Sequence, residues 1–490
     1  MKNIFKYIIV LAASMSFLTS CEDWKLLDEN PKKIGSTTFL DDAKSVKAEI
    51  NSIYYHMRRT EVWGRYLSVL TESLSDYCYG RGNFATTYEN GLTSGGQGFT
   101  KDTWAVIYRS IRLANNLLVD MKDVPMTDKE RAEFTAEIRY LRAFSYLQLV
   151  KYWGGVPLFD ETNMNDFNKP RSSAEDIWAF ILKDAQYAAE NLPATVAESG
   201  RPTKYSALMV VTEASMWTQD YTTAANACAT IINDGKYSLV ELATAADFAN
   251  VYAHTTVNSS EEIFYIKYNR ESGNTFEWMY LCKPNPVYAT GALGIYTDYE
   301  KNTVIKNWDN NDFRYQWTLY HSTNATLGKL TKTGYICIKF RDTETNGLAM
   351  ATDFPVYRYA DCLLYNAEAI ARRDGKPNAT AMEMINMVRR RAYGLNPKVA
   401  HESDYALADY STLDKFIELL LKEKAYEQCF EGKRYADLKR MGLLAKYAVK
   451  AGRVASESAV GEAAYWWPIP TSEFNYNTAL DPTVDQNPGY

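Results

Sequence analysis

Residues 132–158 read AEFTAEIRYLRAFSYLQLVKYWGGVPL, and this stretch does most to decide the fold. Its apolar residues recur at helical spacing, which predicts a helix over about residues 128–152. The helix is followed by Gly155-Val156-Pro157, and a proline cannot continue a helix. The centre of this stretch therefore predicts a long helix that ends in a sharp turn.

Apolar residues on both sides of this stretch repeat with the same spacing. The series Ala43 to Met57, Trp104 to Met121 and Val356 to Ile370 step by three or four residues, which gives each helix one apolar face. Further helices are expected at about residues 174–191, 203–218, 221–234, 378–392 and 412–430. The second helix of the pair 203–218 and 221–234 opens like that of a tetratricopeptide repeat, and such pairs bury their faces by stacking. The expected fold is mostly α, a tetratricopeptide-like right-handed helical scaffold.

Two segments lack this periodicity. Residues 236–355, here called the insert, are rich in Gly, Asn, Asp, Pro, Tyr and Trp and contain the β-prone run Glu262 to Tyr268. Residues 75–101, here called the early segment, are also irregular. Long irregular segments in a compact protein are usually functional. We therefore expect an N-terminal helical part at 41–235, a long and partly β insert carrying the ligand face, and a C-terminal helical part at 356–490.

The N-terminus has the pattern of a bacterial lipoprotein. Residues 1–20 read as a signal peptide, with two lysines before an apolar run that is too short to span a bilayer. Leu18-Thr19-Ser20-Cys21 resembles a lipobox, so Cys21 is expected to carry the lipid and residues 21–40 to form a tether. Glu22 and Asp23 resemble the surface-export signal of Bacteroidetes lipoproteins.

Composition excludes some classes of function. A formal net charge of -6 argues against nucleic acid, because neutralising phosphates requires a basic surface. Aromatic residues make up 14% of the chain, including 37 Tyr and 11 Trp, and such side chains suit half-wet surfaces. The six cysteines after Cys21 show no CxxC spacing, and for the three that fall in helical patterns a small buried apolar side chain is the favoured interpretation.

The quoted stretch resembles the signature of the SusD/RagB family of Bacteroidetes nutrient-binding lipoproteins, a Glu-x-Arg-x-x-Arg-Ala helix followed by Gly-x-Pro. Further blocks similar to the family follow in order along the chain. They are Arg171-Ser172, Gly200 to Lys204, Tyr359 to Ala369, Glu423 to Glu427, Phe430 to Leu438, Pro468-Ile469-Pro470 and Gln486 to Tyr490. The resemblance covers nearly the whole chain, and it departs from the family pattern at Lys424 and Thr478.

The resemblance implies a function at the cell surface. Members of the family bind glycans through an arc of aromatic rings and deliver them to a SusC-like TonB-dependent transporter. We therefore expect a lipid-anchored outer-membrane protein that faces the cell exterior and captures oligosaccharide or polysaccharide.

The irregular segments supply the candidate ligand-binding residues. Aromatic faces stack on the C–H faces of sugars, and polar neighbours read the hydroxyl groups. We expect the two segments to lie together and to form one site. The predicted stacking residues are Trp278, Tyr288, Tyr296, Trp308 and Trp317, and the predicted residues of the early segment are Asp76, Tyr77, Arg81 and Asn83.

Enzymatic motifs are weak, and no catalytic residue, cofactor or metal site is predicted. Glu423, Glu427 and Glu431 repeat every four residues beside basic residues, which favours ion pairs over the opposed carboxylates of a glycosidase. The four histidines show no metal-binding or triad spacing. Three alternatives to glycan capture remain open: a RagB-like protein that binds peptide or glycopeptide, an assembly scaffold, and a surface glycosidase.

Overall fold

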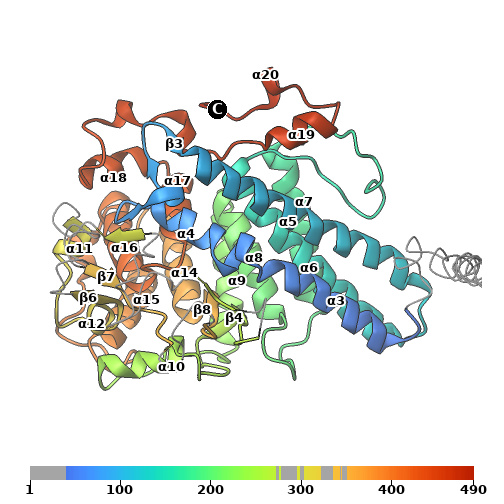
Figure 1. Cartoon of the computed structure of the whole chain (residues 1–490). Helices are drawn as coiled ribbons and strands as arrows, with labels where there is room; N and C mark the ends of the chain where they lie inside the picture. Colours follow the sequence, from blue (N-terminus) through green and yellow to red (C-terminus); the bar gives the residue numbers. More distant parts are fainter. Residues whose placement is uncertain are drawn as a thin grey trace, which may run out of the picture.

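The computed structural model describes residues 40–271, 275–277, 295–297, 303–321, 335–342, 344 and 350–490. Helices form most of the described chain, and short strands gather toward one end of the molecule (Figure 1). The α-helices are α3 (Ala43–Met57), α4 (Tyr66–Ser73), α5 (Ser94–Asp120), α6 (Asp128–Trp153), α7 (Ala174–Asn191), α8 (Lys204–Trp217), α9 (Tyr221–Asn233), α10 (Ala249–Tyr252), α11 (Thr303–Lys306), α12 (Phe313–Thr318), α14 (Tyr359–Arg373), α15 (Ala379–Ala392), α16 (Leu413–Glu427), α17 (Arg434–Arg440), α18 (Leu444–Lys450), α19 (Thr471–Tyr476) and α20 (Pro482–Asp485).

The long helices pack in sequence order as a stack of neighbours. Helix α5 packs on α6, α6 on α7, α7 on α8 and α8 on α9. The chain then leaves the stack for the insert, and on its return α14 packs directly on α9 and then α15 packs on α14. This arrangement confirms the predicted helical scaffold, in which each helix pair buries the faces of its neighbours. None of the helices in the described part of the chain is long and apolar enough to cross a membrane.

The strands are short and pair antiparallel in two-stranded sheets. The pairs are β1 (Cys78–Gly80) with β5 (Ile295–Thr297), β2 (Thr86–Thr87) with β3 (Gly91–Leu92), β4 (Glu262–Ile266) with β8 (Phe354–Arg358), and β6 (Leu319–His321) with β7 (Tyr335–Cys337). Pairing of β4 with β8 joins the beginning and the end of the insert. The insert therefore leaves and rejoins the helical scaffold at one place.

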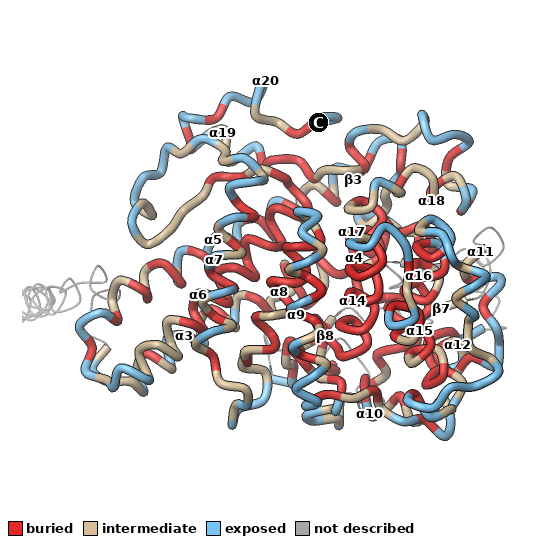
Figure 2. The backbone as a smooth tube through the Cα atoms, turned by 180° about the vertical axis from the view of Figure 1, so that it is seen from behind, coloured by how far each residue is buried: buried red, intermediate tan, exposed pale blue. Residues whose placement is uncertain are grey.

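Helix α6 contains the stretch that decides the fold, and its second half is the centre of the core. Thr127 caps it through a capping box with Glu130, and every residue from Ala136 to Trp153 except Arg139 is buried (Figure 2). Arg142 lies inside this core with its Nε 2.7 Å from the Asp184 carboxylate of α7. Buried charges need such partners. The polar residues of the quoted stretch thus fix the contact between α6 and α7.

The blocks that resemble the family meet at the end of α6. Arg171 Nε donates to the Gly155 carbonyl at 2.7 Å, and its Nη2 donates to Asn487 Oδ1 at 2.9 Å. Asn487 Nδ2 donates to the Trp153 carbonyl at 2.9 Å. Trp153 Nε1 donates to the Pro468 carbonyl, also at 2.9 Å. The chain's last residues therefore fasten onto the turn that ends the long helix.

A buried network of ion pairs joins the insert to the C-terminal helices. Its central guanidinium belongs to Arg358, which lies 3.1 Å from Glu261, 2.9 Å from Glu427 and 2.8 Å from Glu431. All four side chains are buried. Arg314, Lys339 and Arg391 contribute further pairs to the same network. Together these pairs link the end of β8 to α16.

One boundary differs from the prediction made from sequence. The early segment was expected to be irregular as far as residue 101, but α5 already begins at Ser94. Thr93 caps this helix by accepting a hydrogen bond from the Gly96 N–H at 3.2 Å. Glycine lowers helix propensity but does not forbid a helix, and here the cap and the packing of the first turn prevail. The irregular part of the early segment therefore ends at residue 93.

Candidate ligand-binding face

The early segment and the insert lie side by side, as expected. Strand β1 of the early segment pairs with β5 of the insert, so that Tyr79 stands opposite Tyr296. Strand β5 also lies beside β7 and contacts α4. Figure 1 shows α4 at the same end of the molecule as the yellow strands of the insert. The fold thus brings together two aromatic-rich segments that are far apart in the sequence.

Glu277 fixes a second crossing between the two regions. Its backbone N–H donates to the Gly64 carbonyl at 3.0 Å, and the Thr60 hydroxyl donates to its carboxylate at 2.9 Å. The Arg65 guanidinium lies 3.2 Å from the other carboxylate oxygen. Residue 277 of the insert is therefore held at the beginning of α4.

Three half-buried rings form an aromatic cluster at this place. The Tyr66 and Phe99 rings are stacked with centroids 4.1 Å apart, and the Phe84 centroid is 4.8 Å from that of Phe99. The Arg65 guanidinium lies 5.3 Å from the Tyr66 centroid. Partly exposed rings can stack on the apolar C–H face of a sugar. Phe84 and Phe99 were not among the predicted residues, although both lie in the early segment.

Arg81 and Asn83 lie beside these rings on the short turn that contains Phe84. Arg81 is half-buried and Asn83 is exposed. The turn packs closely on the start of α5: a Cβ atom at Gly95 would come within 2.5 Å of the Asn83 amide oxygen. A glycine at 95 therefore allows the turn to approach the helix. We call Tyr66, Arg81, Asn83, Phe84 and Phe99 the candidate face.

Asp76 and Tyr77 do not lie on this face. Asp76 is 2% exposed and forms a bidentate pair with Arg434, with distances of 2.8 Å to Nε and 2.9 Å to Nη2. The Tyr77 ring is fully buried and packs edge-on against Phe430 at 6.0 Å. Contrary to prediction, both side chains hold the base of the early segment and are closed to a ligand in this structure.

Trp308 and Trp317 are also buried, which corrects their predicted stacking role. Trp308 is 3% exposed and stacks on Tyr426 of α16 with a centroid distance of 4.6 Å. The Arg341 guanidinium covers the Trp317 ring at 3.8 Å, and Trp317 Nε1 donates to the Lys339 carbonyl at 2.8 Å. Rings packed in this way have no free face for a sugar.

The other three predicted stacking residues are Trp278, Tyr288 and Tyr296. Trp278 and Tyr288 lie outside the described residues, and Tyr296 is described only through its place in β5. Tyr320 of β6, which also belongs to the insert, is 37% exposed. Among the described residues of the insert, Tyr320 is the aromatic residue with a large exposed side chain.

Glu72 of α4 is a buried carboxyl group close to Gly432. Burial raises its pKa to about 8, although the Gly432 N–H donates to Oε1 at 2.5 Å and opposes this rise. The pKa in the fold thus exceeds the ordinary value of 4.5, so Glu72 is mostly protonated at neutral pH. Its contribution to stability is complete below pH 4.5 and is lost as the pH rises through about 8.

We expect Glu72→Gln to remove this part of the pH dependence, because glutamine keeps an acceptor for Gly432 but does not titrate. As the pH is raised from 5 to 9, the unaltered chain should lose a few kcal/mol in free energy of unfolding that the variant keeps. Denaturant titrations at a series of pH values measure this difference. A difference that stays constant over that range would contradict the assignment.

The three glutamates that repeat every four residues in the sequence are engaged in the buried ion-pair network. Glu423, Glu427 and Glu431 are all buried in ion pairs, with Arg314, Arg391 and Lys339 among their partners. This confirms that they form ion pairs. Within the described ranges, no group of three or more His, Cys, Asp or Glu side chains could hold a metal ion.

The cysteines of the described ranges are buried thiols without disulfide bonds, the state that the sequence favoured for the three in helical patterns. They are Cys78, Cys228, Cys337, Cys362 and Cys429. Burial raises the pKa of the Cys78 and Cys429 thiols well above the ordinary value, and the nearby carboxyl group of Glu72 adds to this rise. A thiol with a raised pKa is a poor nucleophile and metal ligand.

Sequence models of two related groups match the chain. The one described as "SusD family" matches residues 260–490, and the one described as "Starch-binding associating with outer membrane" matches residues 25–213. Together they span most of the chain. The chain belongs to the SusD/RagB family. The descriptions of the matching model and of a matching relative name starch-binding proteins, and the chain is not an enzyme.

Known SusD-like proteins are similar to the chain over nearly their whole length. A SusD-like protein P2 of Formosa agariphila is 25% identical, with 99% of this chain and 100% of the relative covered. A SusD homolog from Bacteroides thetaiotaomicron has a solved structure that matches with a TM-score of 0.77 at 22% identity, covering 94% of this chain and 99% of the other. A laminarin-binding SusD-like protein matches with a TM-score of 0.71 at 21% identity, covering 92% and 100%. The chain therefore has the same fold as these two SusD-like proteins.

Proposed function

We propose that this SusD-family chain captures oligosaccharides with the candidate face and the adjoining part of the insert. The observation that carries the proposal is the pairing of β1 with β5, which sets the insert beside the half-buried cluster of Tyr66, Phe84 and Phe99. Rings with polar neighbours such as Arg81 and Asn83 suit the alternating C–H and hydroxyl surface of a sugar. The starch-binding description of the matching model and the laminarin-binding neighbour support this ligand class.

A glycan array probed with the purified protein tests the ligand class. We expect binding to neutral glucans, with laminarin and starch oligosaccharides as the first probes. Because RagB-like peptide binding is the main alternative, a peptide array is probed in parallel. Binding to peptides with no signal on any glycan would contradict the proposal.

We further propose that Cys21 is acylated and anchors the chain in the outer membrane. Support comes from the lipobox-like sequence Leu18 to Cys21 and from the outer-membrane association in the description of the matching model. The beginning of α3 lies beside the turn at Pro125, at the end of the molecule opposite α11, β6 and β7 of the insert (Figure 1). An anchor attached before α3 would leave the candidate face pointing away from its point of attachment.

We expect Cys21→Ala to release the protein from the membrane fraction, since two or three acyl chains provide stable anchoring and none would remain. Fractionation of cells followed by a carbonate wash and immunoblotting measures the release. Ser20→Ala, which keeps a small residue before the cysteine, serves as the matched control and should stay anchored. Retention of Cys21→Ala in the washed membranes would contradict the lipoprotein assignment.

Delivery to a SusC-like TonB-dependent transporter completes the proposed function. A binding protein without catalytic activity must pass its ligand on intact, and an anchored protein can do so to a neighbour in the same membrane. The proposal is supported by the family assignment of the chain.

A further inference from the structure

A large open pocket lies far from the candidate face. It has a volume of about 970 Å³, at the upper end of the range for ligand pockets. Its walls come from residues 237–241, helix α10, residues 255–260, the start of α14 and residues 397–398. Helix α10 is at the lower edge of both whole-chain views, whereas β3 of the early segment is near the top (Figures 1 and 2). The pocket and the candidate face are therefore separate surfaces.

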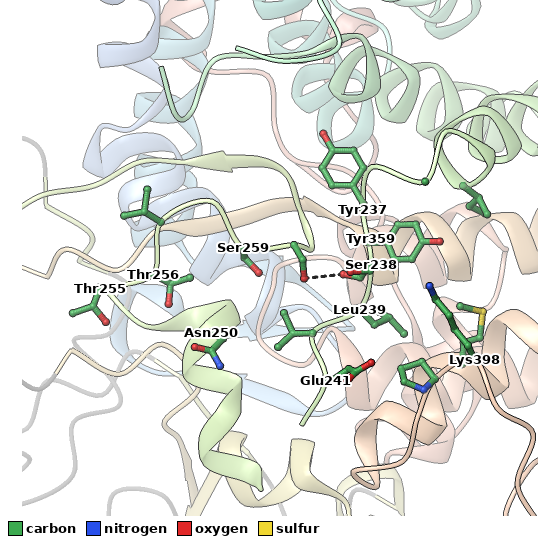
Figure 3. A pocket seen from close by; sticks show the side chains of 17 residues that line it. Tyr237, Ser238, Leu239, Glu241, Asn250, Thr255, Thr256, Ser259, Tyr359 and Lys398 are labelled. Atoms are coloured by element: carbon green, nitrogen blue, oxygen red, sulfur yellow. Dashed lines mark hydrogen bonds between the residues drawn. The ribbon is translucent and has the colours of Figure 1, made fainter. Parts of the chain in front are cut away.

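Neutral hydroxyl and amide groups dominate the polar lining of this pocket. Figure 3 shows Asn250, Thr255, Thr256 and Ser259 on one side and Ser238 on the other. Such groups both donate and accept hydrogen bonds, as the hydroxyl groups of a sugar require. The charged side chains in the lining are one carboxylate and one ammonium, Glu241 and Lys398, so their charges cancel. This balance favours a neutral ligand over an anionic one.

Aliphatic side chains lie among these polar groups. Val257 lines the pocket and is 70% exposed, so its methyl groups are open to a ligand. Leu239, Met387 and Pro397 also contribute to the lining. A surface that mixes neutral hydroxyl groups with aliphatic patches matches the polar edges and apolar faces of a saccharide.

The central wall of the pocket is held rigid by the fold. The Ser238 N–H donates to the Ser260 carbonyl at 3.0 Å, and the Ser260 hydroxyl donates back to the Ser238 carbonyl at 3.1 Å, the bond drawn as a dashed line in Figure 3. The Val240 N–H donates to the carboxylate of Glu261 at 3.0 Å. Glu261 is itself held by Arg358 and Arg391 of the buried network. A wall that is already ordered lowers the entropic cost of binding.

We propose that this pocket is a second saccharide-binding site that takes a neutral oligosaccharide independently of the candidate face. The ligand class rests on the proposed function, whereas the location of the site does not. Two sites on one chain would bind a long polysaccharide more tightly than either site alone, because the second contact becomes intramolecular.

Methyl-detected NMR with added laminarin and starch oligosaccharides tests the two sites separately. We expect the methyl signals of Thr255, Thr256 and Val257 to shift on titration, and these shifts to persist in a Phe84→Ala variant. Asn250→Ala, at an exposed position of α10, should raise the Kd read from the pocket signals about tenfold by removing one or two hydrogen bonds. A pocket-filling Thr255→Trp variant should abolish the shifts of Thr256 and Val257.

The Thr93 hydroxyl donates to the Asn83 carbonyl at 3.4 Å, so the methyl signals of Thr93 and its neighbour Leu92 report on the candidate face in the same spectra. Shifts there with none in the pocket would overturn the second site and leave the proposed function intact. Pocket shifts with none at Leu92 or Thr93 would support the second site and overturn the candidate face as the primary one. The absence of shifts at both places would overturn both assignments for neutral glucans.

Discussion

Replacing Arg358 with leucine is expected to lower the free energy of unfolding by about 3–5 kcal/mol or more, because breaking a buried ion pair leaves uncompensated charge in the core. Arg358 contacts the carboxylates of Glu261, Glu427 and Glu431, and none of these groups can reach water. Urea denaturation measures the loss. The matched control is Arg373→Leu, which removes an exposed pair with Asp374 and should change stability by less than about 1 kcal/mol.

The pH dependence of stability gives a second measure of the same network. Burial would raise the pKa of Glu427, but Arg391, Arg358 and Arg314 outweigh burial and hold it at about 2. This pKa lies below the ordinary value of 4.5, so the stabilisation is present above pH 4.5 and is lost as the pH falls toward 2. In Arg358→Leu the loss should begin at a higher pH. Two results would contradict the described network. One is an acid titration of Arg358→Leu that equals that of the unaltered chain. The other is equal stability of Arg358→Leu and Arg373→Leu.

Trp308→Ala is expected to destabilise the protein by about 3–5 kcal/mol, the usual cost of removing a large buried ring. The ring lies on Tyr426 and is 3% exposed, so its loss opens a cavity between the insert and α16. Thermal and urea denaturation measure this change. Tyr320→Ala removes a partly exposed ring from the same insert and should cost far less.

Similar stability of the Trp308→Ala and Tyr320→Ala variants would contradict the buried position of Trp308. Loss of oligosaccharide binding by a Trp308→Ala protein of normal stability would do so as well, and would restore the stacking role expected from the sequence.

The helices could be predicted from sequence because their signals are local. A helix was expected over 174–191, and α7 spans Ala174–Asn191 with Ser173 as its cap. The same holds for α8 and α9, which begin and end within one residue of prediction. Spacing of three and four residues and capping depend only on near neighbours along the chain.

Exposure of the site residues could not be predicted in the same way, because it depends on partners far along the chain. Asp76, Arg81 and Asn83 look alike as polar residues of an irregular segment. Asp76 is buried because it pairs with Arg434, an arginine 358 positions further along the chain. Trp308 and Tyr320 likewise stand in similar surroundings, but Trp308 meets a ring of α16 and Tyr320 does not. Sequence therefore located the segments that meet at the candidate face, but not which of their side chains are buried and which are exposed.

Calorimetric titration of Phe84→Ala with the best-binding oligosaccharide tests the central claim most directly. Phe84 packs on Phe99 at the outer part of the candidate face, whereas the control Phe167→Ala removes a ring that is 61% exposed on another loop, beside Arg112. Loss of one stacking ring costs about 1–3 kcal/mol by analogy with base stacking. We expect a 5- to 150-fold higher Kd for Phe84→Ala and an unchanged Kd for Phe167→Ala, with both variants folded at the temperature of the titration. Equal affinity of the two folded variants would contradict it.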